Sequence, residues 1–220
     1  PNNGPISLTG LTSGQYVAVG NPYPSEINAD SFIDANSDGT GAGTLYFWRK
    51  TNGVGSSAYA TYTKAGPVGL PAGSGVANGG FTPNGTIAVG QGFITTAPAS
   101  GTIAFANTMR TSTNSAQFLR VKKVDKNRVW LSLTTGTNFV NQMMVAYMDG
   151  ATNNVDNGID GKYINDSQVA LTSSINNEEY VIQGRPVFSD ADVVNLNFKT
   201  DAAGTYTIAK DHVDGLFATG

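Results

Sequence analysis

The stretch Tyr16-Val-Ala-Val-Gly-Asn-Pro-Tyr-Pro-Ser25 indicates the fold class, because it reads as a short strand that stops at a proline corner. Aromatic and β-branched residues are enriched in its first half, as is typical of strands. Asn21-Pro-Tyr-Pro24 follows at once, and its two prolines lack the backbone N–H groups that a helix or a central strand needs. The stretch therefore predicts a strand that ends in an irregular corner.

The same pattern of strand and punctuation recurs along all 220 residues. Gly, Asn, Pro or Asp separates runs that are rich in β-branched and aromatic residues. These runs cover residues 6–11, 15–20, 44–49, 58–64, 92–96, 101–105, 117–124, 128–134, 141–147, 180–185, 193–200 and 204–210. One short helical turn is expected, capped by Asn28 or Asp30 and carrying Phe32 and Ile33 inward. The pattern predicts an all-β fold, an antiparallel β-sandwich that resembles a jelly roll.

The chain is long enough for one large β-domain or two small ones. Residues 1–186 are predicted to form a β-sandwich with a Gly/Pro-rich surface loop at about residues 65–85, which lacks large apolar side chains. After Pro186 the strand pattern starts again. Residues 187–220 are therefore either the start of a second, truncated β-sandwich or the last strands of the same domain. Because the chain begins at Pro1 without a signal peptide, we expect it to belong to a longer parent protein with other domains.

Composition excludes several classes of partner. Only 13% of the residues are charged and the formal net charge is −3, so nucleic acid is not an expected partner. There is no Cys for disulfides or thiolate metal sites, and no apolar run is long enough for membrane insertion. The basic residues gather between Arg120 and Arg128. Because Arg120, Lys122, Lys126 and Arg128 share strand parity, we expect a solvated strand face there rather than an anion site.

The segment Asp34-Ala-Asn-Ser-Asp-Gly-Thr40 is a candidate Ca²⁺ site. Asp34, Asn36 and Asp38 occupy the first, third and fifth positions of a calcium loop, and Gly follows at the sixth. The twelfth position is Leu45 instead of the bidentate Glu, so the remaining ligands would have to come from elsewhere in the fold. The alternative is an Asx-rich turn that follows the predicted helix.

A second candidate Ca²⁺ site lies between Asp149 and Gly161, where several Asp and Asn oxygens fall within a dozen residues. Asp156 and Asp160 are the favoured ligands, with Asp149 nearby. Asn-Gly and Asp-Gly pairs are also the commonest residues of tight turns. The alternative is therefore a long hairpin loop without a metal.

Four aromatic residues are candidate ligand-binding residues for a glycan. Tyr46 and Trp48 share one strand face, and Tyr59 and Tyr62 lie near the predicted loop. A sugar ring can stack its apolar face on exposed rings of this kind. The alternation around Tyr46 also fits a strand that is buried on both sides, in which case these rings belong to the core.

No catalytic constellation is evident. His212 is the single histidine, it lies in a turn-like context, and the chain has no Gly-x-Ser-x-Gly motif. The chain contains three Glu, so a glycosidase would need to draw its acid and base mainly from Asp. We therefore expect a protein that is not an enzyme.

A set of short motifs in one order gives the chain a family resemblance. The motifs are Val19-Gly-Asn-Pro-Tyr-Pro-Ser25, Ala29-Asp-Ser-Phe-Ile33, Thr44-Leu-Tyr-Phe-Trp48, Tyr59-Ala-Thr-Tyr62, Val89-Gly-Gln-Gly-Phe-Ile94, Ile182-Gln-Gly-Arg185 and Asp211-His-Val-Asp-Gly-Leu-Phe217. With them the chain resembles the β-rich region upstream of the C-terminal sorting domain in surface proteins of Bacteroidota that the type IX secretion system exports. The resemblance implies an extracellular or outer-surface location in adhesin-like proteins, and it favours Asp156 and Asp160 over the first loop for calcium.

The sequence thus predicts a non-enzymatic extracellular module of an adhesin-like protein that serves attachment or glycan binding. One alternative is a structural spacer or stalk that presents other domains, which would show buried aromatics and no concave aromatic site. The other is an accessory domain of a polysaccharide-degrading enzyme, which would need two carboxylates about 5 to 10 Å apart in a cleft.

Overall fold

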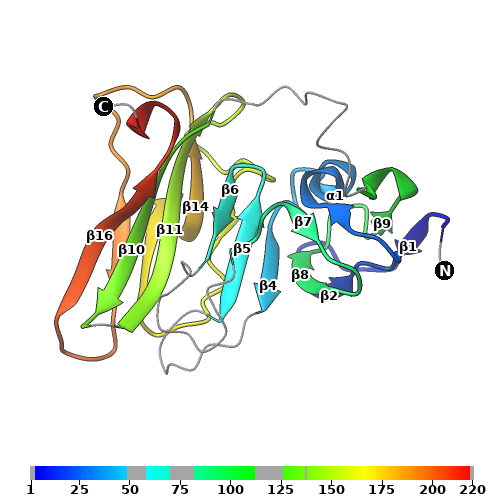
Figure 1. The fold of residues 1–220 in the computed structure, drawn as a ribbon, viewed down its shortest axis with the longest axis horizontal. Helices are drawn as coiled ribbons and strands as arrows, with labels where there is room; N and C mark the ends of the chain where they lie inside the picture. The colour runs from blue at the N-terminus through cyan, green and yellow to red at the C-terminus, as the bar shows by residue number, and fades with distance from the viewer. Residues whose placement is uncertain (1–2, 49–57, 70–81, 112–125, 137, 219–220) are drawn as a thin grey trace.

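The computed structural model describes residues 3–48, 58–69, 82–111, 126–136 and 138–218 (Figure 1). Its strands are β1 (Ile6–Leu8), β2 (Tyr16–Gly20), β3 (Ile27–Asn28), β4 (Leu45–Trp48), β5 (Tyr59–Thr63), β6 (Gly66–Val68), β7 (Thr86–Ile87), β8 (Gly92–Thr96), β9 (Ile103–Phe105), β10 (Lys126–Thr135), β11 (Asn138–Met148), β12 (Gly161–Lys162), β13 (Ala170–Ile175), β14 (Glu178–Arg185), β15 (Leu196–Lys199) and β16 (Tyr206–Val213). The helical elements are α1 (Ala29–Asn36) and the 3₁₀ turns η1 (Asn107–Met109) and η3 (Gly215–Ala218). The predicted all-β fold is confirmed.

Two larger sheets dominate the described part of the chain. A five-stranded sheet has the order β2-β8-β4-β5-β6, and a seven-stranded sheet has the order β15-β13-β14-β11-β10-β16, with β12 paired to β14. The sheets form a sandwich, and α1 with the short pairs β1–β9 and β3–β7 lies beyond the five-stranded sheet (Figure 1). Most pairings are antiparallel, but β11 and β14 run parallel.

The outer face of the five-stranded sheet packs on α1. Asn28 caps the helix as the sequence predicts, because its side-chain oxygen accepts a hydrogen bond from the Ser31 N–H at 2.8 Å. Phe32 and Ile33 are fully buried in this core. Phe32 meets Phe93 of β8 edge to face, with ring centroids 5.1 Å apart. The packing of α1 on the five-stranded sheet therefore follows from the local helix signal and from the alternation of inward and outward side chains along β4 and β8.

The inner face of the five-stranded sheet packs on the seven-stranded sheet. This second core joins Val68 of β6 to Met144 of β11 and Ile182 of β14, with Trp130 of β10 at its side. Gly66–Val68 lies inside the segment that the sequence predicts as a surface loop. That prediction is wrong for these three residues, because pairing with β5 buries Gly66 and Val68 although no large apolar run marks them. Residues 70–81 lie outside the described part.

The last strands complete the seven-stranded sheet. β15 pairs with β13 and β16 pairs with β10, so both strands belong to the same sheet as β10, β11 and β14. The two strands are at opposite edges of the sheet, yet Phe198 and Tyr206 have ring centroids 5.2 Å apart. The sheet therefore curls over a third core that includes Leu133, Met143 and Leu171.

Some elements differ from the expected runs. β13 was not predicted, because Ala170-Leu-Thr-Ser-Ser-Ile175 contains three small polar residues, two of which are buried. The predicted strand at 117–124 lies outside the described residues, as do Arg120 and Lys122. His212 is in β16 rather than in a turn, and its ring stacks on Trp130 with centroids 4.0 Å apart.

Candidate functional site

The four candidate aromatic residues do not share one surface. In the pairing of β4 with β5, Trp48 lies opposite Tyr59, whereas Tyr62 lies opposite Leu45. Neighbouring residues of a strand point to opposite faces. Tyr46, Trp48 and Tyr59 therefore point toward the inner face of the five-stranded sheet, and Tyr62 points away from it.

Two of the four rings are core residues. Tyr46 is 1% exposed and donates a hydrogen bond from its hydroxyl to the Lys162 carbonyl of β12 at 2.8 Å. Tyr62 is 8% exposed and donates to Asp30 of α1 at 2.9 Å. The prediction of a four-ring platform is wrong for this pair, because β4 and β5 are covered by α1 on one side and by the seven-stranded sheet on the other. Burial also raises the pKa of both phenols.

Trp48 remains a candidate for ligand contact. Its side chain is 65% exposed, and Tyr59 opposite is partly exposed. The structure adds Tyr16 of β2, which is 50% exposed and lies edge-on to Tyr46 with ring centroids 6.1 Å apart. Sequence reasoning missed Tyr16. The signal that could have found it is the alternation of Tyr16 with the apolar Val17, which is typical of a strand with one buried and one exposed face.

The first candidate calcium loop spreads its oxygens in three directions. Asp34 pairs with Lys64 at 2.5 Å. The buried Asn36 side chain donates to the Ala104 carbonyl and accepts from the Ala104 N–H. Asp38 accepts hydrogen bonds from the Thr40 N–H and hydroxyl. This arrangement is the Asx-rich turn that the sequence offered as the alternative.

The second candidate loop uses its carboxylates on its own backbone. Asp160 is 4% exposed and accepts from the N–H groups of Asp156 and Gly184, each at 2.6 Å. Asp156 accepts from the N–H of Thr152 at 2.5 Å and from its hydroxyl at 3.0 Å, whereas Asp149 is exposed. Within the described ranges, no three His, Asp or Glu side chains gather as a metal site would require. Calcium binding stays a prediction, and the observed geometry is that of a turn.

Asp156 and Asp160 also bear on the polysaccharide-degrading alternative, which needs two carboxylates in a cleft. They belong to one closed loop, and Asp160 is buried beneath Gly184. The low polarity around Asp160 raises its pKa to about 7, although the two backbone N–H groups act in the opposite direction. The Asp160 carboxyl thus holds the N–H groups of Asp156 and Gly184 inside the loop.

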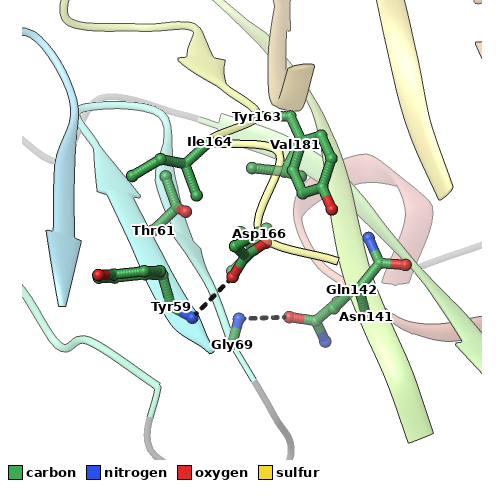
Figure 2. Close-up of a pocket in the computed structure, with 10 residues that line it drawn as sticks. Tyr59, Thr61, Gly69, Asn141, Gln142, Tyr163, Ile164, Asp166 and Val181 are labelled. Carbon is green, nitrogen blue, oxygen red and sulfur yellow. Dashed lines mark hydrogen bonds between the residues drawn. The ribbon is translucent and has the colours of Figure 1, made fainter. Parts of the chain in front are cut away.

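A small pocket lies where the two sheets meet (Figure 2). Its polar lining includes Tyr59, Gln142, Tyr163 and Asp166. Asp166 accepts from the Ala58 N–H at 2.6 Å and the Tyr59 N–H at 3.2 Å, and Gln142 accepts from the N–H of Gly69 at 3.0 Å. The pocket volume is about 10 Å³, which holds roughly one water molecule and no sugar ring.

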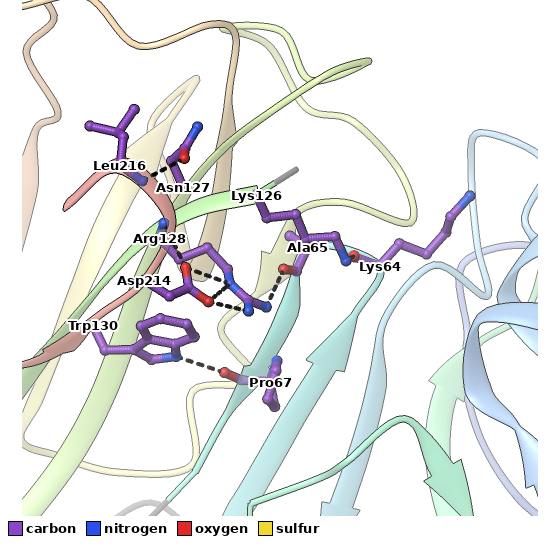
Figure 3. Close-up of polar contacts among 9 residues, drawn as sticks. All are labelled: Lys64, Ala65, Pro67, Lys126, Asn127, Arg128, Trp130, Asp214 and Leu216. Atoms are coloured by element: carbon purple, nitrogen blue, oxygen red, sulfur yellow. Dashed lines mark hydrogen bonds and ion pairs between the residues drawn. The ribbon is translucent and has the colours of Figure 1, made fainter. Parts of the chain in front are cut away.

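Alternate residues of β10 reach across to β6 and to the turn that precedes it (Figure 3). The Lys126 ammonium donates to the Lys64 carbonyl, the Arg128 guanidinium to the Ala65 carbonyl at 3.2 Å, and the Trp130 indole to the Pro67 carbonyl at 2.9 Å. We call these three contacts the cross-sheet ladder. The predicted solvated face is therefore wrong for Lys126 and Arg128, because the second sheet covers it; burial lowers the pKa of Lys126.

The loop around Asp160 makes a second set of contacts between the sheets. The Asn157 side chain donates to the Ser37 hydroxyl at 2.9 Å and to the Gly41 carbonyl at 2.7 Å. The Thr44 hydroxyl donates to the Asp160 carbonyl, and the Thr63 hydroxyl donates to the Ile159 carbonyl at 2.6 Å. We call residues 151–161 the clasp loop.

Comparison with known proteins gives a family but no activity. Residues 2–220 match the family described as domain of unknown function, DUF8693, and the chain therefore belongs to that family. No curated protein and no solved structure shows significant similarity to it. None of these comparisons bears on the type IX secretion resemblance, which stays a prediction. No helix in the described residues is both long and apolar enough to cross a membrane.

Proposed function

We propose that this chain, as a member of the DUF8693 family, is a non-enzymatic module of an extracellular or outer-surface protein and serves as a rigid connector between other domains. The observation that carries the proposal is the double attachment of the two sheets. The cross-sheet ladder holds β10 to β6 and to the turn that precedes it. The clasp loop adds contacts at the same end of the five-stranded sheet, because it hydrogen-bonds to Thr44, Thr63 and Lys64.

The chemistry of these contacts suits a connector. Side chains donate to backbone carbonyls, which occupy fixed positions in a sheet. A hydrogen bond of this type stabilises a protein by about 1 kcal/mol net, and leaving a buried partner unsatisfied costs about 1 to 3 kcal/mol. Sliding one sheet over the other would break several such bonds together. The sandwich is therefore expected to transmit load as one body.

Several of the groups that would serve a ligand in the other two interpretations are used inside the protein, although Trp48 is exposed. Tyr46 and Tyr62 are buried, as the spacer alternative requires. Asp156 and Asp160 accept backbone N–H groups, which does not favour the polysaccharide-degrading alternative. The extracellular location rests on the low content of charged residues, the abundance of Gly and the family resemblance.

Native-state hydrogen exchange tests the connector directly. Exchange is followed by mass spectrometry at increasing denaturant for β4 and β5 of one sheet and for β10 and β11 of the other. If the sheets form one cooperative body, their slowest amides converge on a single free energy of opening. Two separate free energies, about 2 kcal/mol or more apart, would overturn the proposal. They would show two layers that open independently.

A further inference from the structure

Part of the inner face of the five-stranded sheet is left uncovered. The seven-stranded sheet covers this face over β4, β5 and β6, where Tyr46 and Val68 are buried. β2 and β8 form the opposite margin of the sheet. On them Ala18, Gly20 and Gly92 are exposed, and they point to the same face as Tyr46. With the partly buried Ile94 of β8, which pairs with Ala18 and with Tyr46, these small residues form a surface that we call the floor.

Aromatic rings stand at both ends of this floor. Tyr16 pairs with Thr96 at one end of β8, and Gly20 pairs with Gly92 at the other. Tyr46 pairs with Ile94 between them, so Trp48, two residues further along β4, lies beside the Gly92 end. Tyr46 fixes the position of the Tyr16 ring by its edge-on contact. We call Tyr16, Ala18, Gly92 and Trp48 the aromatic ledge.

Exposed aromatic rings are rare elsewhere on the described surface. Three aromatic residues are among its exposed large hydrophobic side chains, Tyr16, Trp48 and Phe198, and two of the three belong to the ledge. Leaving a Trp and a Tyr exposed gives up the favourable free energy of burying them, so the two exposed rings on one face of the sheet indicate a contact surface.

The ledge carries no charge. None of the described side chains of β2, β4 and β8 that point to this face is ionisable to a cation or a carboxylate. The nearby Lys162 ammonium of β12 already pairs with Glu178 at 2.7 Å. Phosphate, nucleic acid and anionic lipid all need cationic partners. The described side chains of this face therefore suit an uncharged occupant with flat apolar faces.

We propose that the aromatic ledge binds a neutral oligosaccharide, with pyranose rings stacked on Tyr16 and Trp48. A pyranose has a flat C–H face that packs on an aromatic ring and polar edges that stay hydrated. A saccharide chain that runs from one ring to the other would cross β8 over Ile94, which lies between Tyr16 and Trp48 in the strand register. This proposal is independent of the proposed connector role, because a rigid connector can function with or without a glycan-binding site.

The test is a glycan array that carries neutral gluco-, manno-, xylo- and galacto-oligosaccharides together with sialylated and uronate glycans, followed by calorimetric titration of the strongest hit. We expect Trp48→Ala and Tyr16→Ala to weaken binding at least tenfold. Ala18→Arg removes no ring but fills the floor, so it should weaken binding as strongly. Phe198→Ala is the matched control, since it removes an exposed aromatic ring from the other sheet and should leave binding unchanged. Thermal melts confirm that each variant is folded.

Three results would overturn the proposal. These are an array without neutral hits, binding that the ledge variants do not weaken, and binding confined to sialylated or uronate glycans. A proline-rich peptide array is run alongside, because such peptides also dock on aromatic surfaces. Binding of those peptides alone would assign the ledge to a protein partner instead. If no glycan binds but hydrogen exchange shows a single free energy of opening, the glycan site is refuted and the connector role still stands.

Discussion

The side-chain amide of Asn157 donates to the hydroxyl of Ser37 at 2.9 Å across 120 positions of sequence. The two residues belong to the two Asx-rich segments that the sequence marks as separate calcium candidates. The structure brings these segments together by direct hydrogen bonds. The polar residues of both segments thus serve as an attachment between layers.

Asn157→Ala should lower the free energy of unfolding by about 2 to 3 kcal/mol. The variant loses two hydrogen bonds and leaves the Gly41 carbonyl without this donor. Urea denaturation followed by circular dichroism measures the change. Asn153→Ala is the control, because Asn153 is an exposed residue of the same loop and its loss should cost less than about 0.5 kcal/mol. Equal effects of the two variants would refute the role of Asn157.

Arg128→Ala should also destabilise the protein, by about 2 to 4 kcal/mol. Its guanidinium donates to both oxygens of Asp214 and to the Ala65 carbonyl, so three acceptor atoms lose a donor together. Lys64→Ala is the matched control, because its ion pair with Asp34 is exposed and should contribute less than about 1 kcal/mol. The stabilities of the two variants are compared by their midpoints of chemical unfolding. A Lys64 variant as unstable as the Arg128 variant would contradict the ladder.

The raised pKa of Asp160 should make the stability of the protein depend on pH in an unusual way. Its pKa in the folded protein is about 7, against about 3.9 in an unfolded chain. Because the folded pKa is the higher one, the contribution of Asp160 is fully present below about pH 4 and is lost as the pH rises through 7. The loss amounts to at most about 4 kcal/mol. Urea midpoints between pH 4.5 and pH 8 should fall in the native protein.

Asp160→Asn isolates this effect, because an amide does not titrate. The variant should show a flatter dependence over the same interval, whatever its absolute stability. A ¹³C titration of the Asp160 carboxyl in the native protein gives an independent reading. Parallel pH curves for the variant and the native protein, or a carboxyl that titrates near pH 4, would show that the clasp loop holds Asp160 ionised.

Calcium should change the thermal midpoint of unfolding by less than about 1 °C. A ligand stabilises the folded state only as far as it binds to it, and the two candidate loops, as the structure describes them, present no preformed calcium site. The carboxylates of Asp156 and Asp160 already bind backbone N–H groups, and a cation would have to displace them. Differential scanning calorimetry in millimolar CaCl₂ and in EDTA tests this. A rise of several degrees that Asp156→Asn abolishes and Asp38→Asn does not would establish calcium at the second loop.

Local signals in the sequence predicted much of the fold. The Asn28 cap, the inward Phe32 and Ile33 and the strand at Gly92–Thr96 each depend on neighbouring residues, and the structure confirms them. Burial of Tyr46 depends instead on Lys162, which follows it by 116 positions. The burial of Lys126 and Arg128 likewise depends on a turn that precedes them by more than 60 positions. Alternation gives the face of a strand but does not say which faces another sheet will cover.

The candidate site was predicted only in part for the same reason. Trp48 remains exposed because it lies at the end of β4, beyond the cover that buries Tyr46. Tyr16 enters the ledge through the pairing of β2 with β8, which joins residues about 80 positions apart. A sequence pattern shows that each of these residues is an outward aromatic residue. It does not show that they stand on one floor.

The separation of the ladder partners has a consequence for how fast the chain folds. The Lys126 ammonium meets the Lys64 carbonyl 62 positions upstream, and the clasp loop closes a span of 120. Bringing such distant residues together costs loop-closure entropy before any contact stabilises them. Folding of β-proteins with such distant contacts therefore takes about milliseconds to seconds. Until β10 and β11 are available, the inner face of β4 to β6 has no cover. The two sheets should therefore acquire their final order late and together.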